Sequence, residues 1–142
     1  VTRFAQLGVT ASIQPAHLLD DRDIAEGIWP GRTDRAFLFA SLAAAGAQLV
    51  LGSDAPVAPL DPWVALGAAV WRTNDDRPAW YPQERLAAEV ALAASTDGHG
   101  VRPHRDDVAD LAICDIDPLA ADPATTVAGT LLAGEWTHRE GI

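Results

Sequence analysis

Gln48-Leu49-Val50-Leu51-Gly52-Ser53-Asp54-Ala55-Pro56-Val57 places an apolar run directly before Gly-Ser-Asp and a proline. A short apolar run that ends in turn residues is typical of a strand buried on both faces, as in a parallel sheet. The carboxyl ends of such strands carry the catalytic groups of α/β folds. Asp54 therefore stands where a catalytic or metal-binding carboxylate is expected. Asp and Ser also favour turns for local reasons, so this stretch alone leaves a simple turn cap open.

The composition describes a folded domain and disfavours two kinds of partner. The chain has 142 residues, of which 49% are hydrophobic, which is enough for one domain with a core. Its formal net charge of −10 argues against nucleic acid and anionic membrane surfaces. No apolar run approaches the roughly 20 residues that span a bilayer. We therefore expect neither a nucleic-acid nor a membrane partner.

The ends of the chain and its single thiol give two further expectations. The chain opens on Val1 and contains no methionine, so we expect a piece of a longer or processed protein. Cys114 has no second cysteine to pair with and lies in an apolar run, which predicts a buried, unreactive thiol. There is no signal-peptide pattern at the start, and a reducing cytoplasm is the expected location.

The first hundred residues alternate predicted strands and helices. Strands are expected at residues 9–13 and 47–53, and helices at residues 1–7, 33–45, 62–71 and 82–94. The helix start at Asp61 and Pro62 is the clearest, because Asp caps a helix and Pro suits its first position. Between the first strand and the helix at 33–45, residues 18–31 are predicted to form a loop with one helical turn.

Beyond residue 100 the pattern predicts strands only, at 108–114, 125–132 and 135–137. The loop before them contains His99 and His104, but no Cys or carboxylate pair completes a zinc ligand set there, so we expect a solvated loop. Two strand–helix units make a poor sheet alone, because a parallel sheet needs several strands and two covered faces. The pattern therefore suggests the ends of two larger structures.

Several segments, taken in order, resemble the metal-dependent amidohydrolase superfamily. They are Ala11–His17, Gly31-Arg32, Leu51–Val57, Asp61–Trp63 and Ala109–Leu119. The similarity is greatest to the amidohydrolase family 3 branch, which includes YtcJ-like hydrolases and N-substituted formamide deformylases. Either the Gly-Ser-Asp-Ala-Pro run or the Ala-Asp-Leu run alone is a weak signal, but the two in this order form a specific combination.

The resemblance implies an α/β fold: the C-terminal part of a (β/α)8 TIM barrel followed by strands of a small β-sandwich. Residues 1–100 would supply barrel strands seven and eight with their helices, and residues 101–142 the sandwich strands. It further implies a hydrolase in which a divalent metal, expected to be zinc, activates water to cleave a carbon–nitrogen bond of a non-peptide amide. Asp54 would be the aspartate of strand eight, both metal ligand and acceptor of the proton from water.

The other metal ligands of the family are absent from this sequence. The His-x-His pair of strand one, the bridging Lys or Glu of strand four and the histidines of strands five and six have no counterpart here. We therefore expect no independent catalysis. The expected partners are a small-molecule substrate and either the missing N-terminal part of the same enzyme or another copy of the chain. The alternative is a catalytically inactive fragment, or a stand-alone domain that pairs with itself or with another chain.

Gln14, His17 and Arg32 are the candidate substrate contacts. Gln14 and His17 follow the first predicted strand, at the presumed active-site edge, although they could equally hold the loop by bonding to the backbone. Arg32 could bind a substrate carboxyl group through two nitrogens, or it could pair with Asp20 or Asp21.

Four other side chains have predicted roles. Arg72 is expected to anchor the end of its helix. Ser53 has no His and Asp arranged around it as a nucleophile would, so it is expected to support Asp54. The five tryptophans are expected to be mostly core residues or loop anchors, although Trp29 and Trp80, in predicted loops, could line an apolar substrate pocket.

Overall fold

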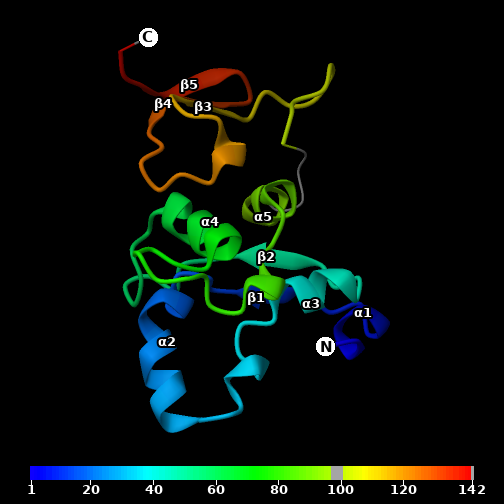
Figure 1. The fold of residues 1–142 in the computed structure, drawn as a ribbon. Helices are drawn as coiled ribbons and strands as arrows, with labels where there is room; N and C mark the ends of the chain where they lie inside the picture. Colours follow the sequence, from blue (N-terminus) through cyan, green and yellow to red (C-terminus); the bar gives the residue numbers. More distant parts are fainter. Residues whose placement is uncertain (97–100, 142) are drawn as a thin grey trace.

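The computed structural model describes residues 1–96 and 101–141, which form a mixed α/β fold with two small sheets (Figure 1). Strands β1 (Ala11–Ile13) and β2 (Leu49–Leu51) pair in parallel. Strands β3 (Leu111–Cys114), β4 (Val127–Leu132) and β5 (Glu135–Arg139) form an antiparallel sheet in that order. The α/β class is thus confirmed. The eight-stranded barrel, the sandwich and the division at residue 100 stay predictions.

The helices lie mainly between and beside the two sheets. They are α1 (Arg3–Gln6), α2 (His17–Ile28), α3 (Phe39–Ala44), α4 (Pro62–Trp71) and α5 (Ala88–Ser95), with short 3-10 turns η1 (Thr33–Arg35), η2 (Pro82–Glu84) and η3 (Pro118–Ala120). Figure 1 shows α4 and α5 as a layer between the β1–β2 sheet and the β3–β4–β5 sheet. Helix α5 contacts α4, β2 and η3, so the helical layer joins the two ends of the molecule.

Helix α4 forms the centre of the core. Asp61 caps it by accepting a hydrogen bond from the backbone N–H of Trp63 at 2.9 Å, as the sequence predicts. Residues 65–70 are all buried. A Cβ at Gly67 would come within 3.2 Å of the carbonyl oxygen of Ala121 and of the ring of Pro123. The missing side chain therefore lets the segment before β4 lie directly against the helix.

Arg72 ends α4 in the left-handed conformation, with φ of 56°, and its side chain is completely buried. Its guanidinium donates hydrogen bonds to the carbonyls of Trp80 (2.6 Å), Phe37 (3.1 Å) and Glu84 (3.3 Å), and lies 5.3 Å from the ring centre of Phe39. Burial lowers the pKa of Arg72 to about 10, against an opposing effect of Glu84, so the group is charged at neutral pH. The predicted anchoring role is confirmed.

The predicted helix at 33–45 is wrong in its middle. Residues 36–38 separate η1 from α3, and Phe37 has a φ of 55°. Thr33 lies in η1, and its buried hydroxyl shares a 2.7 Å hydrogen bond with the hydroxyl of Tyr81. The break exposes the Phe37 carbonyl to Arg72, a contact made across 35 positions of sequence.

The predicted helix at 82–94 is interrupted in the same way. Arg85 and Ala87 are extended between η2 and α5. Here Leu86 is buried and its N–H donates to the carbonyl of Ala69 at 3.0 Å, which a continuous helix would not permit. The buried carboxylate of Glu84 accepts hydrogen bonds from the backbone N–H and the hydroxyl of Ser41, which fixes η2 against α3.

The predicted loop at 18–31 is also wrong, because most of it belongs to the 12-residue helix α2. Only Leu18 and Ala25 of α2 are buried, so the apolar periodicity is weak. Polar contacts to the 73–81 loop hold it instead. Arg22 donates to the carbonyl of Pro78 at 3.0 Å, and Arg77 pairs with Asp23 at 2.7 Å.

The structure decides two further expectations. Trp80 lies in the core, where it is 4% exposed, so of its two expected roles core packing is confirmed. Strand β2 is less enclosed than expected, because Leu49 is buried while Val50 and Leu51 are only partly covered. The remaining strands are found close to their predicted positions, most of them shorter.

Replacing Arg72 with Lys is expected to lower the free energy of unfolding by about 3 kcal/mol or more, because one ammonium group cannot reach three carbonyls in different directions. Chemical denaturation measures this change. The matched control is Arg85→Lys at an exposed position, for which we expect a change within about 0.5 kcal/mol. Equal stability of the two variants would contradict the anchoring role.

The turn after β3 predicts an acid-sensitive contact. The carboxylate of Asp115 accepts from the backbone N–H of Thr126 at 2.7 Å and from its hydroxyl at 2.9 Å. Hydrogen bonds from Thr126, first from its backbone and then from its hydroxyl, lower the pKa of Asp115 below the ordinary value. Because the folded-state pKa is depressed, the stabilisation is complete above the unfolded-state pKa and is lost as the pH falls through the folded-state pKa.

Asp115→Asn should therefore lower the Tm at pH 7, and the difference from the parent protein should shrink towards pH 2.5. Thermal unfolding followed by circular dichroism across this range measures both effects. Glu135→Gln on exposed β5 is the control and should show no comparable pH-dependent difference. A Tm difference for Asp115→Asn that is constant with pH would contradict the assignment.

Candidate functional site

The parallel pairing of β1 and β2 brings the segments after both strands to one edge. Ile13 pairs with Leu51, and the N–H of Gly52 donates to the carbonyl of Ile13 at 2.9 Å. Gln14 and Ser53 therefore follow neighbouring strand ends. Figure 1 shows α2 starting beside this edge. The edge corresponds to the position where α/β folds carry their reactive groups.

Asp54 lies on an exposed turn directly after β2. Its φ is 55°, a left-handed conformation that Asp, Asn and Gly adopt more readily than other residues. Its carbonyl accepts from Val57 N–H at 2.9 Å, and the Ser53 hydroxyl accepts from Ala55 N–H at 3.2 Å. Ser53 thus supports the turn through the backbone. The Asp54 carboxylate projects from a turn that is held without using it.

The other two residues at this edge are only partly exposed. The side-chain amide of Gln14 donates to the hydroxyl of Ser12 at 3.4 Å. His17 begins α2, and its Nε2 atom is buried without a hydrogen-bond partner among the described residues. The expected alternative of a backbone bond to this imidazole nitrogen is therefore not seen. A small hollow of about 170 Å³ next to the edge is bordered by Ser53 and by the start of α4.

Arg32 lies away from the strand ends. Helix α2 has 12 residues and so extends for about 18 Å from His17 before the chain turns back. Arg32 is exposed and, within the described part of the chain, forms no ion pair with Asp20 or Asp21. The structure thus brings Gln14, His17 and Asp54 to one edge, but not Arg32.

The described residues do not provide a complete divalent-metal site. Residues 1–96 and 101–141 contain no group of three or more His, Cys, Asp and Glu side chains placed to hold an ion. Asp54 is a suitable donor but stands alone, and zinc requires three or four converging ligands. His104 is exposed, and its backbone N–H donates to the carboxylate of Asp107, while His99 lies outside the described residues.

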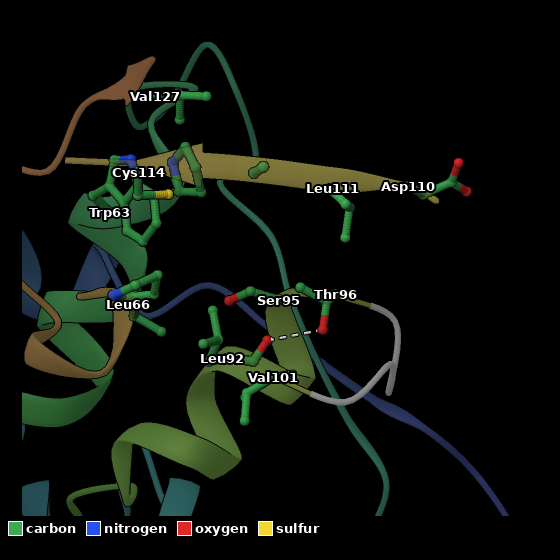
Figure 2. A pocket seen from close by; sticks show the side chains of 13 residues that line it. Trp63, Leu66, Leu92, Ser95, Thr96, Val101, Asp110, Leu111, Cys114 and Val127 are labelled. Atoms are coloured by element: carbon green, nitrogen blue, oxygen red, sulfur yellow. Dashed lines mark hydrogen bonds between the residues drawn. The ribbon is translucent and has the colours of Figure 1, made fainter. Parts of the chain in front are cut away.

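A larger apolar cavity of about 330 Å³ lies between helices α4 and α5 and the β3–β4 pair (Figure 2). Figure 2 shows the carboxylate of Asp110 pointing away from the other labelled side chains, and this carboxylate accepts from Ala133 N–H at 2.6 Å. The Ser95 hydroxyl donates to the carbonyl of Ala91 at 3.0 Å. Among the described side chains that line this cavity, no base faces a free nucleophile.

Cys114 lines the same cavity and is half-buried instead of fully buried. Burial, with a smaller effect from the adjacent Asp115, raises the pKa of the Cys114 thiol. A raised pKa keeps the sulfur protonated at neutral pH and so poorly nucleophilic. The predicted lack of reactivity is therefore supported, although its burial is less than expected.

Arg35 is a candidate binding residue that the sequence pattern did not single out. Arg35 and Arg32 both border a hollow of about 280 Å³, together with Trp29 and Ala36. The available signal was the spacing of three positions, which puts two side chains on the same side of a helical turn. Trp29 does line a hollow, as predicted, and is 56% exposed.

Among the described residues, no helix combines the length and the apolar character needed to cross a membrane.

Comparisons with known proteins identify a family and two curated relatives. A model of the amidohydrolase family matches residues 1–138. "Protein LONG AFTER FAR-RED 3" of Arabidopsis thaliana is 43% identical over 97 residues, which cover 66% of this chain and 17% of the relative. "Putative amidohydrolase YtcJ" of Bacillus subtilis (strain 168) is 26% identical over 137 residues, which cover 87% of this chain and 26% of the relative.

The chain thus spans about a quarter or less of the length of these curated relatives. No solved structure matches it significantly. The family match extends from the first residue to β5, and so includes both sheets and the Asp54 turn. By this match the chain belongs to amidohydrolase family 3.

Proposed function

We propose that residues 1–142 form the part of a metal-dependent hydrolase that contributes Asp54 to the cleavage of a carbon–nitrogen bond in a non-peptide amide. Membership of the amidohydrolase family indicates a hydrolase in general terms. The observation that carries the finer proposal is the position of Asp54, exposed on a stable turn at the carboxyl end of a parallel strand pair.

In this proposal the carboxylate of Asp54 acts as a general base. A carboxylate within hydrogen-bond distance of the attacking water accepts its proton and can return that proton to the departing amine. The turn around Asp54 uses only backbone groups and the Ser53 hydroxyl, so both carboxylate oxygens are available. Gln14 and His17, from the neighbouring strand end, are proposed to contact the substrate near its reacting bond. Arg32, beyond the far end of α2, is proposed to contact only a distant part of the substrate.

A divalent metal, for which we propose zinc, would lower the pKa of a bound water towards neutrality. Asp54 can supply one ligand, and the described residues supply no group that completes the set. The remaining ligands, and much of the substrate pocket, would come from other parts of the protein. The proposed partners are accordingly a small-molecule substrate and the sequence that supplies these ligands.

A second candidate function is a catalytically inactive domain that pairs with itself or with another chain. The observation that favours it is the apolar surface beside β2, where Val57 is 70% and Leu60 is 84% exposed. The two-stranded parallel sheet also has few strands for a stable sheet. Both features suit a surface that is covered in a larger assembly.

Asp54→Asn is expected to reduce kcat by about 10²–10⁴-fold, the range for a positioned acid–base group, in the protein expressed with any coding sequence that precedes residue 1 in frame. Hydrolysis of formamides and small amides, with zinc present, measures the change. Because Asn tolerates the left-handed conformation, the Tm should be unchanged. Retention of most activity would exclude Asp54 as the base.

Two control variants distinguish the effect of losing the Asp54 carboxylate from the effect of disturbing its turn. Asp54→Val should lower stability by roughly 1–2 kcal/mol, because a β-branched residue is strained at positive φ. Asp76→Asn removes an exposed carboxylate elsewhere and should leave both activity and Tm unchanged.

The pairing candidate predicts a mass greater than one chain in light scattering of residues 1–142. Leu60→Asp together with Val57→Asp should return the protein to the mass of one chain, because charges in the apolar surface oppose its burial. Ile113→Asp, at an exposed apolar position of β3, is the control. A monomer at all concentrations, before and after these changes, would exclude self-pairing.

A further inference from the structure

The segment between β1 and α3, which includes helix α2, borders two hollows. Figure 1 shows α2 running away from the β1–β2 sheet and the following segment returning past η1 to α3. One hollow, of about 380 Å³, is lined mainly by apolar side chains, with Ile24 and Ile28 of α2 facing Phe37. The other, of about 280 Å³, is bordered by Arg32 and Arg35. We call the pair the α2 pocket.

The two hollows adjoin because Trp29 and Ala36 line both. The indole of Trp29 is 56% exposed, although burial of such a side chain would be favourable. Ile24 and Ile28 are likewise 59% and 66% exposed. Apolar side chains at one end and cationic side chains at the other therefore form one continuous amphipathic surface around Trp29.

The two arginines at the cationic end of the α2 pocket are not paired with acidic side chains of the described residues. Among the residues that the structure describes, neither Arg32 nor Arg35 forms an ion pair, although the chain carries a formal net charge of −10. Two acidic groups are near in sequence or in space: Asp34 lies between the arginines and is exposed, and Asp21 lines the apolar hollow. Two guanidinium groups in one hollow can hold a carboxylate through several charged hydrogen bonds.

Contacts at its base give the α2 pocket a defined shape. Thr33 is held by the hydroxyl of Tyr81, and the carbonyl of Phe37 by Arg72. On the other side, Arg22 and Asp23 of α2 are bound to the 73–81 loop. The walls are thus fixed by groups that do not line the cationic hollow, which leaves Arg32 and Arg35 available for a ligand.

We propose that the α2 pocket binds small amphipathic monocarboxylates, with the apolar group against Trp29 and Ile28 and the carboxylate between Arg32 and Arg35. Hollows of this size suit small organic ligands. A bare inorganic anion would leave the apolar hollow unfilled, and a polyanion is opposed by the net charge of the chain. The inference that such a monocarboxylate is the substrate rests on the proposed function. Binding of a monocarboxylate by the α2 pocket is tested separately, by an experiment that does not measure turnover.

The test uses 3-phenylpropionate as the probe. Two controls each keep one part of this molecule: 3-phenylpropan-1-ol keeps the apolar group, and acetate keeps the carboxylate. Calorimetric titration of the protein, with its fold checked by circular dichroism, should show that 3-phenylpropionate binds at least about tenfold more tightly than either control. Added salt should weaken the binding of the carboxylate and not that of the alcohol. Equal affinity for the alcohol, or no saturable binding of 3-phenylpropionate, would overturn the proposal.

Substitutions locate the site. Arg32→Gln with Arg35→Gln should weaken 3-phenylpropionate binding by about tenfold or more and leave binding of the alcohol unchanged. Asp34→Asn should strengthen binding, because it removes a carboxylate beside the arginines. Arg3→Gln in α1, which lines neither hollow, removes a positive charge elsewhere and should change nothing. An unchanged affinity in the double variant would contradict the assignment, whether or not Asp54 proves catalytic.

Discussion

The buried charge of Arg72 is the constraint on which the middle of the molecule depends. A guanidinium without water must be hydrogen-bonded, because an unpaired buried charge is very costly. The Nε and Nη1 atoms of Arg72 meet this need with carbonyls at Phe37, Trp80 and Glu84, which belong to three separate segments, while Nη2 has no partner among the described residues. Each of these segments must therefore present a free carbonyl at a fixed place around the end of α4. The loop after α4, the entry to α3 and the turn η2 are fixed together.

The same constraint explains which elements sequence reasoning could find. Strand β2 and helix α4 depend on local signals, an apolar run before Gly-Ser-Asp and a capping Asp61 before Pro62, and both are present. The helices predicted at 33–45 and 82–94 are locally plausible but are broken by contacts with Arg72, Ser41 and Ala69, distant in sequence. Helix α2 was missed for the converse reason: polar contacts with a distant loop stabilise it where its apolar pattern is weak.

The residues of the candidate site also differ in whether local sequence signals could predict their positions. Asp54 could be singled out because it directly follows an apolar run that ends in turn residues, and its neighbours Gln14 and His17 follow from parallel pairing. The distance of Arg32 from that edge could not be foreseen without knowing that α2 is a helix. Its pairing with Arg35 in one hollow depends on how the returning segment folds back, which involves Tyr81 and Arg72.

The close approach of another segment to Gly67 also affects the order in which parts of the protein can fold. The segment that covers it includes Ala121, whose carbonyl also accepts a hydrogen bond from the indole of Trp71 across 50 positions of sequence. Contacts between such distant positions are slow to close, because the intervening chain must first be ordered. During synthesis on the ribosome, α4 emerges well before Ala121. One face of α4 therefore stays uncovered until the segment that includes Ala121 and Pro123 has been synthesised and has folded back onto the helix.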